Sequence, residues 1–141
     1  MSFEKFMKKN KAVKENTFYP ATKSLCDEKG KPLEWEIKPL TTKDVEKIRE
    51  SCTSEVPIKG KPGMYLQKMS NDYTSKLIAA AVVSPNLYDA ELQDSYGVTT
   101  PHALLVEMID NPAEFAEFLN FIQNYSGIDT TMDEEIAEAK N

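Results

Sequence analysis

Residues 33–44 read Leu-Glu-Trp-Glu-Ile-Lys-Pro-Leu-Thr-Thr-Lys-Asp, a strand pattern followed directly by the start of a helix. Leu33, Trp35 and Ile37 alternate with charged side chains, which is the period-two pattern of a strand with one buried face. The sequence therefore predicts a strand over 33–38, with these three side chains turned toward a core.

The residues before this strand predict its partner. Asp27-Glu28-Lys29-Gly30 has the composition of a tight turn, and Gly30 can adopt a positive φ without steric cost. The preceding run, residues 18–26, supplies the second strand, and Pro20 restricts the beginning of that run to a sheet edge. We therefore expect a β-hairpin near the N-terminus.

Helical patterns dominate the rest of the chain. Thr41 and Thr42 begin a helix, with Asp44 near its positive end, and its apolar face is formed by Val45, Ile48 and Cys52. Residues 54–63 hold two prolines and two glycines and predict an exposed loop. Residues 64–83 then predict a long central helix that stops before Pro85, with a stripe made of Leu66, Met69, Tyr73, Leu77 and Ala80.

Three further helices follow. Residues 89–97 form a short one that Gly97 ends, and Thr100-Pro101 begins the next, with its buried face formed by Leu104, Leu105, Met108 and Ile109. Asn111-Pro112 repeats the start signal, and Gly127 ends the last helix. Its apolar stripe is broad, roughly 160° of arc at about 100° per residue, and consists of Phe115, Phe118, Leu119, Phe121, Ile122 and Tyr125.

The two ends of the chain differ. Ser2 can cap a short N-terminal helix with Phe3, Phe6 and Met7 on one stripe. Residues 129–141 predict an acidic, mobile tail. We therefore expect an α+β fold, a mainly helical single domain over residues 1–128 with about five helices and an N-terminal β-hairpin.

Composition limits the classes of function. Of the 141 residues 40% are hydrophobic, which suffices for one core. The longest strongly apolar run, 77–83, is far shorter than the roughly 20 residues of a membrane span, and no secretory signal begins the chain. We expect a cytoplasmic protein that does not associate with membranes.

Charge is distributed unevenly along the chain. Residues 1–70 hold 15 Lys/Arg and 10 Asp/Glu, a balance of +5, whereas residues 71–141 hold 2 and 13, a balance of −11, which gives the total of −6. The acidic half would repel nucleic acid and attract a basic partner, although solubility alone also explains such a balance. The basic run Lys8, Lys9, Lys11 and Lys14 lacks interleaved aromatic residues, so we expect no nucleic-acid binding.

Catalytic and cofactor sites have little support. Cys26, Cys52 and the single histidine, His102, are too few for a zinc site, and we expect no metal and no cofactor. A thiol-dependent enzyme that uses Cys52 and His102 stays open as an alternative. A small phage-encoded regulator or nucleic-acid-binding adaptor that acts through the N-terminal lysines is another.

The order of motifs resembles a known family. Residues 24–41 combine a short strand, an acidic-glycine turn and a tryptophan-containing strand that leads into a threonine-capped helix. Residues 82–98 follow, and then the paired helices up to Gly127. Over roughly residues 10 to 128 this order is similar to that of the XkdN-like tail assembly chaperones of bacteriophages. Ser24-Leu25 stands where many members carry a basic-aromatic pair.

The resemblance implies a function without catalysis. Such proteins are chaperones that coat the tape measure protein of long-tailed phages, help to recruit tail tube subunits, and are absent from the finished virion. We therefore expect the tape measure protein and the tail tube protein as partners, in the cytoplasm of a bacterial host. Self-association stays open as a further interaction.

The wide aromatic stripe predicts where a helix-rich partner binds. An apolar groove can hold one face of a helix, and flanking acidic groups select basic segments. Closure of the core by the same side chains is the competing explanation. The predicted apolar residues are Leu105, Met108, Phe115, Phe118, Phe121 and Tyr125, and the flanking acids are Glu107, Asp110, Glu114 and Glu117.

Overall fold

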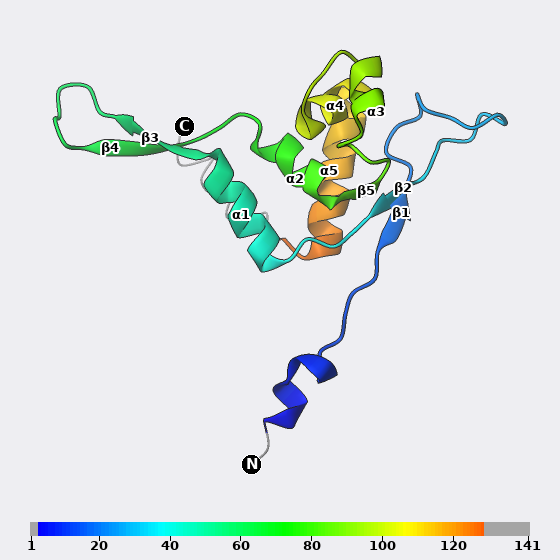
Figure 1. Ribbon diagram of the computed structural model, residues 1–141, viewed down its shortest axis with the longest axis horizontal. Helices are drawn as coiled ribbons and strands as arrows, with labels where there is room; N and C mark the ends of the chain where they lie inside the picture. Colours follow the sequence, from blue (N-terminus) through cyan, green and yellow to red (C-terminus); the bar gives the residue numbers. More distant parts are fainter. Residues whose placement is uncertain (1–2, 129–141) are drawn as a thin grey trace.

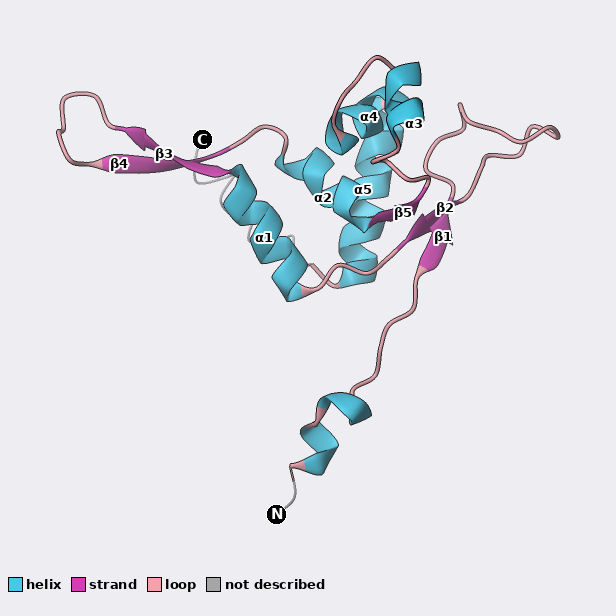
Figure 2. Cartoon of the chain, in the orientation of Figure 1, coloured by secondary structure: helices cyan, strands magenta, loops and turns pink. Residues whose placement is uncertain are grey.

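The structure is a computed structural model that describes residues 3–128. Within that range the chain forms a mainly helical α+β domain with two small antiparallel sheets (Figures 1 and 2). After two 3₁₀ turns, Glu4–Phe6 and Lys8–Asn10, the elements are β1 Thr17–Tyr19, β2 Trp35–Ile37, α1 Thr42–Cys52, β3 Thr53–Pro57, β4 Tyr65–Met69, α2 Tyr73–Ala81, β5 Val82–Ser84, α3 Ala90–Ser95, α4 Pro101–Met108 and α5 Pro112–Ser126.

The predicted N-terminal strand pair is confirmed. β1 pairs antiparallel with β2, with Tyr19 opposite Trp35, and β5 adds a third strand to the other side of β2. The partner strand predicted over 18–26 is wrong in most of its length: β1 ends at Tyr19, directly before Pro20, and Cys26 forms only an isolated bridge with Pro32.

The predicted turn at Asp27–Gly30 does form, within the long connection between β1 and β2. The Asp27 carboxylate accepts hydrogen bonds from the N–H groups of Lys29 and Lys31, both at 2.9 Å, and Gly30 has φ 81°.

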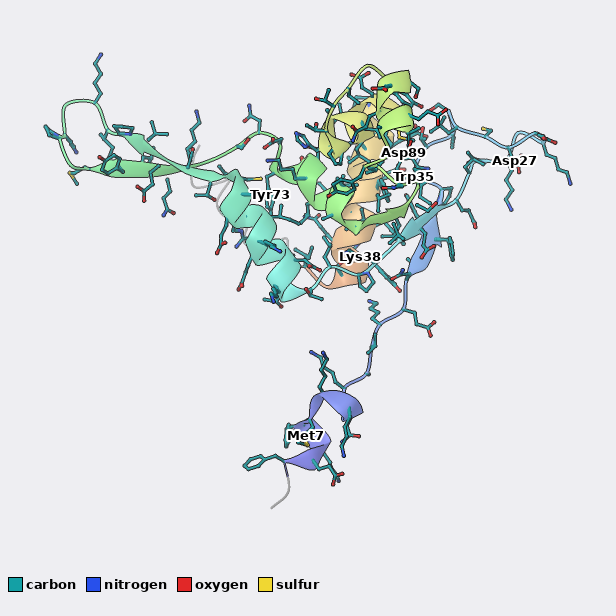
Figure 3. The ribbon with its side chains drawn as sticks, in the orientation of Figure 1. Met7, Asp27, Trp35, Lys38, Tyr73 and Asp89 are labelled. Atoms are coloured by element: carbon teal, nitrogen blue, oxygen red, sulfur yellow. The ribbon has the colours of Figure 1, made fainter. Side chains whose placement is uncertain are left out.

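The core lies between β2 and the helices. Trp35 and Ile37 from β2 are buried, and α2 packs against α1, α4 and α5. Figure 3 shows Trp35 in the body of the molecule, whereas Met7 and Asp27 lie on segments that extend from it. The largest contributions from the helices come from Leu77, Ile78, Leu104, Leu105, Phe118 and Ile122.

Most helix ends follow the predicted capping chemistry. Thr41 and Asp44 form a capping box at α1, with the Asp44 N–H 3.2 Å from the Thr41 hydroxyl oxygen. The hydrogen bond from the Thr41 N–H holds the pKa of Asp44 below its ordinary value. At α3 and α4 a single side-chain acceptor caps the helix: Asp89 accepts from the N–H of Leu92, and Thr100 accepts from the N–H of Ala103. Local side-chain chemistry therefore fixes these starts.

The predicted central helix over 64–83 is wrong in its first part and at its end. Residues 65–69 form β4, only Tyr73–Ala81 is helical, and residues 82–84 form β5. The predicted loop over 54–63 is wrong as well, because Thr53–Pro57 is β3, paired antiparallel with β4. Leu66 and Met69 have helical spacing, but the Pro62-Gly63 turn returns the chain so that Leu66 pairs with Val56 instead.

Two smaller expectations need correction. Leu33 is 45% exposed and lies outside β2, so only Trp35 and Ile37 form the buried face of the strand. The N-terminal residues form 3₁₀ turns, and Phe3, Phe6 and Met7 are exposed there. The predicted cap Ser2 and the predicted tail 129–141 lie outside the described residues.

The β3–β4 hairpin, residues 53–69, projects from the body, as Figure 1 shows. We call it the hairpin arm. Every residue of β4 is exposed. Five prominent apolar side chains of the arm remain exposed to solvent: Val56, Met64, Tyr65, Leu66 and Met69.

Candidate partner-binding surface

The helix α5 begins and ends where its sequence predicts. The Asn111 side-chain oxygen accepts hydrogen bonds from the N–H groups of Ala113 and Glu114 at 3.0 and 3.1 Å, and Pro112 occupies the first helical position. Gly127 ends the helix in the left-handed conformation, with φ 74°. These two ends fix which side chains of α5 face the rest of the body.

Three of the ten predicted contact residues belong to the core. Leu105, Met108 and Phe118 are buried, and the ring of Phe118 meets Trp35 edge to face at 5.7 Å. In this conformation the three side chains support the surface from beneath. A partner that binds this surface would therefore contact the other seven predicted residues rather than these three.

Tyr19 of β1 extends the aromatic row of α5, and the sequence did not suggest it. Tyr19 of β1 stacks on Phe121 at 4.3 Å and on Phe118 at 5.4 Å, and Phe121 stacks on Tyr125 at 5.9 Å. The register places Tyr19 opposite Trp35. That cross-strand pair is the signal that could have identified it, because opposite residues share one face of a sheet.

The N-terminal segment covers the end of this row. The Lys14 ammonium lies 4.1 Å from the centre of the Tyr125 ring, a cation–π contact, and it also donates to the Tyr125 carbonyl oxygen. The Tyr125 hydroxyl donates to the carbonyl oxygen of Glu15. Phe121 and Tyr125 are therefore half-buried under the protein's own chain.

Three of the four predicted acids line a hollow beside Tyr19. The hollow has a volume of about 620 Å³ and includes Asp110, Glu114 and Glu117. Glu114 accepts 2.8 Å hydrogen bonds from the N–H of Lys23 and the hydroxyl of Thr22, and these bonds hold its pKa below the ordinary value. Burial, followed by the charges of Glu117 and Glu114, raises the pKa of Tyr19. Glu114 thus fastens the β1–β2 connection to α5.

A second hollow lies between α4 and α5. Its volume is about 520 Å³, and its lining includes Val106, Glu107, Asp110 and Phe115. Val106 is 47% exposed and Phe115 is half-buried, so apolar surface is accessible here between two exposed carboxylates. Asp110 lines both hollows. The structure thus divides the single predicted groove into two hollows, with Phe118 buried in the core.

The residues considered for catalysis, Cys26, Cys52 and His102, line neither hollow. His102 faces Asp72, with Nε2 3.5 Å from Oδ2. The Ser70 hydroxyl, followed by Lys76 and His102, holds the pKa of Asp72 below its ordinary value. Cys52 is buried at the end of α1, and the Cys26 thiol is exposed and lies 2.9 Å from the Lys23 carbonyl oxygen.

Two other kinds of site, a metal site and a membrane-spanning helix, are absent from residues 3–128. Among residues 3–128, no group of three or more His, Cys, Asp or Glu side chains is arranged to hold a metal ion. No helix within the same range is both long and apolar enough to cross a bilayer.

Of the N-terminal lysines, Lys9 forms an exposed ion pair with Glu4 at 3.0 Å, and Lys14 covers Tyr125.

Comparison with known proteins gives consistent results. The chain is 22% identical over 122 residues to the phage-like element PBSX protein XkdN of Bacillus subtilis. The matched region covers 86% of this chain and 82% of XkdN. It is 23% identical over 127 residues to the protein YqbN of the same organism, over 90% of this chain and 85% of YqbN.

The fold also matches a solved structure. The crystal structure of YqbN superimposes with a TM-score of 0.71 at 19% identity, covering 92% of this chain and 97% of YqbN. The family model of the phage XkdN-like tail assembly chaperone protein matches residues 3–140. Because this match spans nearly the whole chain, the protein belongs to the XkdN-like phage tail assembly chaperone family.

Proposed function

We propose that this protein binds the tape measure protein during tail assembly and helps to bring tail tube subunits to it, without catalysing a reaction. The family match over residues 3–140 carries the proposal. The exposed apolar and acidic surface around α4 and α5 supports it, because a protein that keeps a helix-rich chain soluble needs such a surface. The proposed place of action is the cytoplasm of the bacterial host.

The α4–α5 hollow is the contact surface that we favour. Val106 and Phe115 offer apolar area, and Glu107 and Asp110 are exposed beside them. A basic, amphipathic helix would complement both properties. The row Phe121–Tyr125 is the weaker candidate because Tyr19, Lys14 and Glu15 already cover it.

Co-expression with a tape measure protein from the same phage or prophage tests this surface. We expect Val106→Ser to lower the soluble, co-purified fraction of the tape measure protein. Val83→Ser is the matched control, because Val83 is 42% exposed on β5 and does not line the α4–α5 hollow. Equal loss with both variants, or with neither, would contradict the assignment to this hollow.

The variant Phe121→Ser separates the two candidate surfaces. Phe121 is half-buried and stacked on Tyr19, so we expect a loss of about 1–3 kcal/mol in the free energy of unfolding, below the cost of a fully buried phenylalanine. Binding by the folded protein should persist. Loss of binding at unchanged stability would move the contact to the aromatic row.

Two further measurements address the remaining parts of the proposal. Mass spectrometry of purified virions and of the infected-cell lysate should find the protein in the lysate alone. Sedimentation of the purified chain, with and without the tail tube protein, reports self-association and tube binding separately. Detection in the virion at a fixed stoichiometry would contradict a chaperone that leaves after assembly.

A further inference from the structure

The hairpin arm exposes apolar side chains on both of its faces. Val56 pairs with Leu66 on one face, and Pro57 pairs with Tyr65 on the other. Neither face packs on another element: every residue of β4 is exposed, as are four of the five residues of β3. An isolated two-stranded hairpin is marginally stable in water, and exposed apolar surface of this kind marks interaction sites.

The two edges of the arm differ in their ability to accept another strand. Hydrogen bonds from Ser70 N–H to Cys52 O at 2.7 Å and from Ile58 N–H to Met64 O at 3.1 Å set the alternation of the ladder. In an antiparallel ladder, residue pairs joined by hydrogen bonds alternate with pairs whose backbone groups point away from the partner strand. The pairs of this second kind are Thr53 with Met69, Glu55 with Gln67, and Pro57 with Tyr65.

Only the β4 edge carries an unbroken row of outward donors. On β3, Pro57 has no N–H, and proline is a common means of blocking an edge. On β4, Tyr65, Gln67 and Met69 each present an N–H and a carbonyl oxygen. Within the described residues the sheet contains β3 and β4 alone, so no strand from residues 3–128 occupies that edge.

The charge of the arm indicates what kind of strand would bind. Lys59, Lys61 and Lys68 are exposed, and none forms an ion pair within residues 3–128, whereas the arm holds one acid, Glu55. Lys68 shares the face of Leu66, and the other two lysines belong to the turn beyond Val56. The apolar centre of that face therefore has positive charge at both ends.

We propose that the β4 edge binds an extended, acidic segment of another protein as a third strand. The segment carries apolar side chains at alternate central positions, beside Leu66 and on the same face of the sheet, and carboxylates at its ends, near the lysines. Main-chain hydrogen bonds to Tyr65, Gln67 and Met69 supply affinity, and the side-chain pattern supplies specificity. This site is separate from the α4–α5 hollow and does not depend on the function proposed for it.

A synthetic peptide tests the proposal. The probe is fluorescein-labelled Glu-Thr-Val-Thr-Val-Thr-Glu, which places two valines between two glutamates on one face, and its matched control replaces both glutamates with lysine. In fluorescence anisotropy titrations of the full chain, we expect the acidic peptide to bind about tenfold more tightly than the basic one at low salt. No saturable binding of the acidic peptide, or equal binding of both, would overturn the proposal.

Proline substitutions identify the edge. Gln67→Pro removes an outward N–H from β4, and Glu55→Pro removes the directly opposite one from β3, so both leave the bonds between the strands in place. We expect Gln67→Pro to weaken peptide binding about tenfold and Glu55→Pro to change it by less than about twofold. Equal effects of the two prolines would overturn the assignment to β4.

Amide hydrogen exchange on the unmodified protein provides a test that does not rely on variants. Addition of the acidic peptide should slow exchange at Tyr65, Gln67 and Met69 and leave Thr53 and Glu55 unchanged. Unchanged exchange at β4, or tighter binding of a short DNA duplex than of the acidic peptide, would overturn the proposal. The DNA result would assign the lysines of the arm to nucleic acid.

Discussion

Helix α5 and the hairpin arm are both rich in aromatic and aliphatic residues, yet the fold treats them in opposite ways. On α5, Phe118 and Ile122 are completely buried, and Phe115, Leu119 and Phe121 are partly buried against the same core. On the arm, Leu66 is 61% exposed, and no other helix or strand of residues 3–128 covers it. Apolar content alone therefore does not reveal the core, because burial depends on what the tertiary structure places opposite each residue.

The contrast has a consequence for stability. The side chains of α5 contribute to global unfolding, since their contacts are lost only when the body opens. Among the described residues, no side chain of the arm belongs to the core or packs against it, so the strands of the arm can separate while the body stays folded. The same exposure that weakens the arm leaves its edge and its side chains free for another protein.

The largest expected effect compares a core residue with an arm residue. Phe118→Ala should lower the free energy of unfolding by about 3–5 kcal/mol, because it leaves a cavity against Trp35. Leu66→Ala should change it by no more than about 0.5 kcal/mol, as for most exposed positions. Denaturant titrations followed by tryptophan fluorescence measure both. A similar cost for the two would mean that the arm packs on the body in solution.

A second comparison uses two glycines with the same backbone conformation. Gly127 at the end of α5 has φ 74° and Gly63 in the arm has φ 82°, and a Cβ would meet no atom within 4 Å at either. Alanine should therefore cost about 1–2 kcal/mol locally at both sites. We expect Gly127→Ala to lower global stability, whereas Gly63→Ala should accelerate hydrogen exchange in the arm alone. A global loss with Gly63→Ala would contradict independent opening of the arm.

The smallest effect concerns pH. The folded pKa of Glu114 lies below its ordinary value of 4.5, so its bonds to Lys23 and Thr22 stabilise the fold above that pH. The contribution is lost as pH falls below 4.5 through the lower, folded pKa. Glu114→Gln should flatten this part of the acid unfolding curve. Glu55→Gln, in the arm, is the control, and an equal effect of both would show that Glu114 has no special role.

Several elements could be predicted from sequence because their causes are local. The Thr41–Asp44 capping box and the Asn111-Pro112 start need only residues within one turn, and Gly127 ends α5 by its own conformational freedom. The alternation at Trp35 and Ile37 is local too, and their strand forms, although it is shorter than the predicted 33–38. The membership in the tail assembly chaperone family likewise follows from an order of such local motifs.

The candidate surface depended more strongly on the tertiary structure. The sequence indicated that α5 has a wide apolar stripe, but the contact with Tyr19 from β1 divides it into a buried part and a covered part. The exposed hollow at Val106 and Phe115 requires α4 and α5 to lie side by side. No spacing within a single helix contains that information.

The sequence by itself determined the helix ends, the turn at Gly30 and the β2 strand, because each rests on the chemistry of neighbouring residues. Tertiary pairing decided the rest. Leu66 and Met69 fit a helix as well as a strand, and pairing with β3 selected the strand. Val82–Ser84 left the helical pattern because β2 offered an open edge for it. Hydrogen-bond partners distant in sequence, which local propensity cannot supply, outweighed the periodicity at both places.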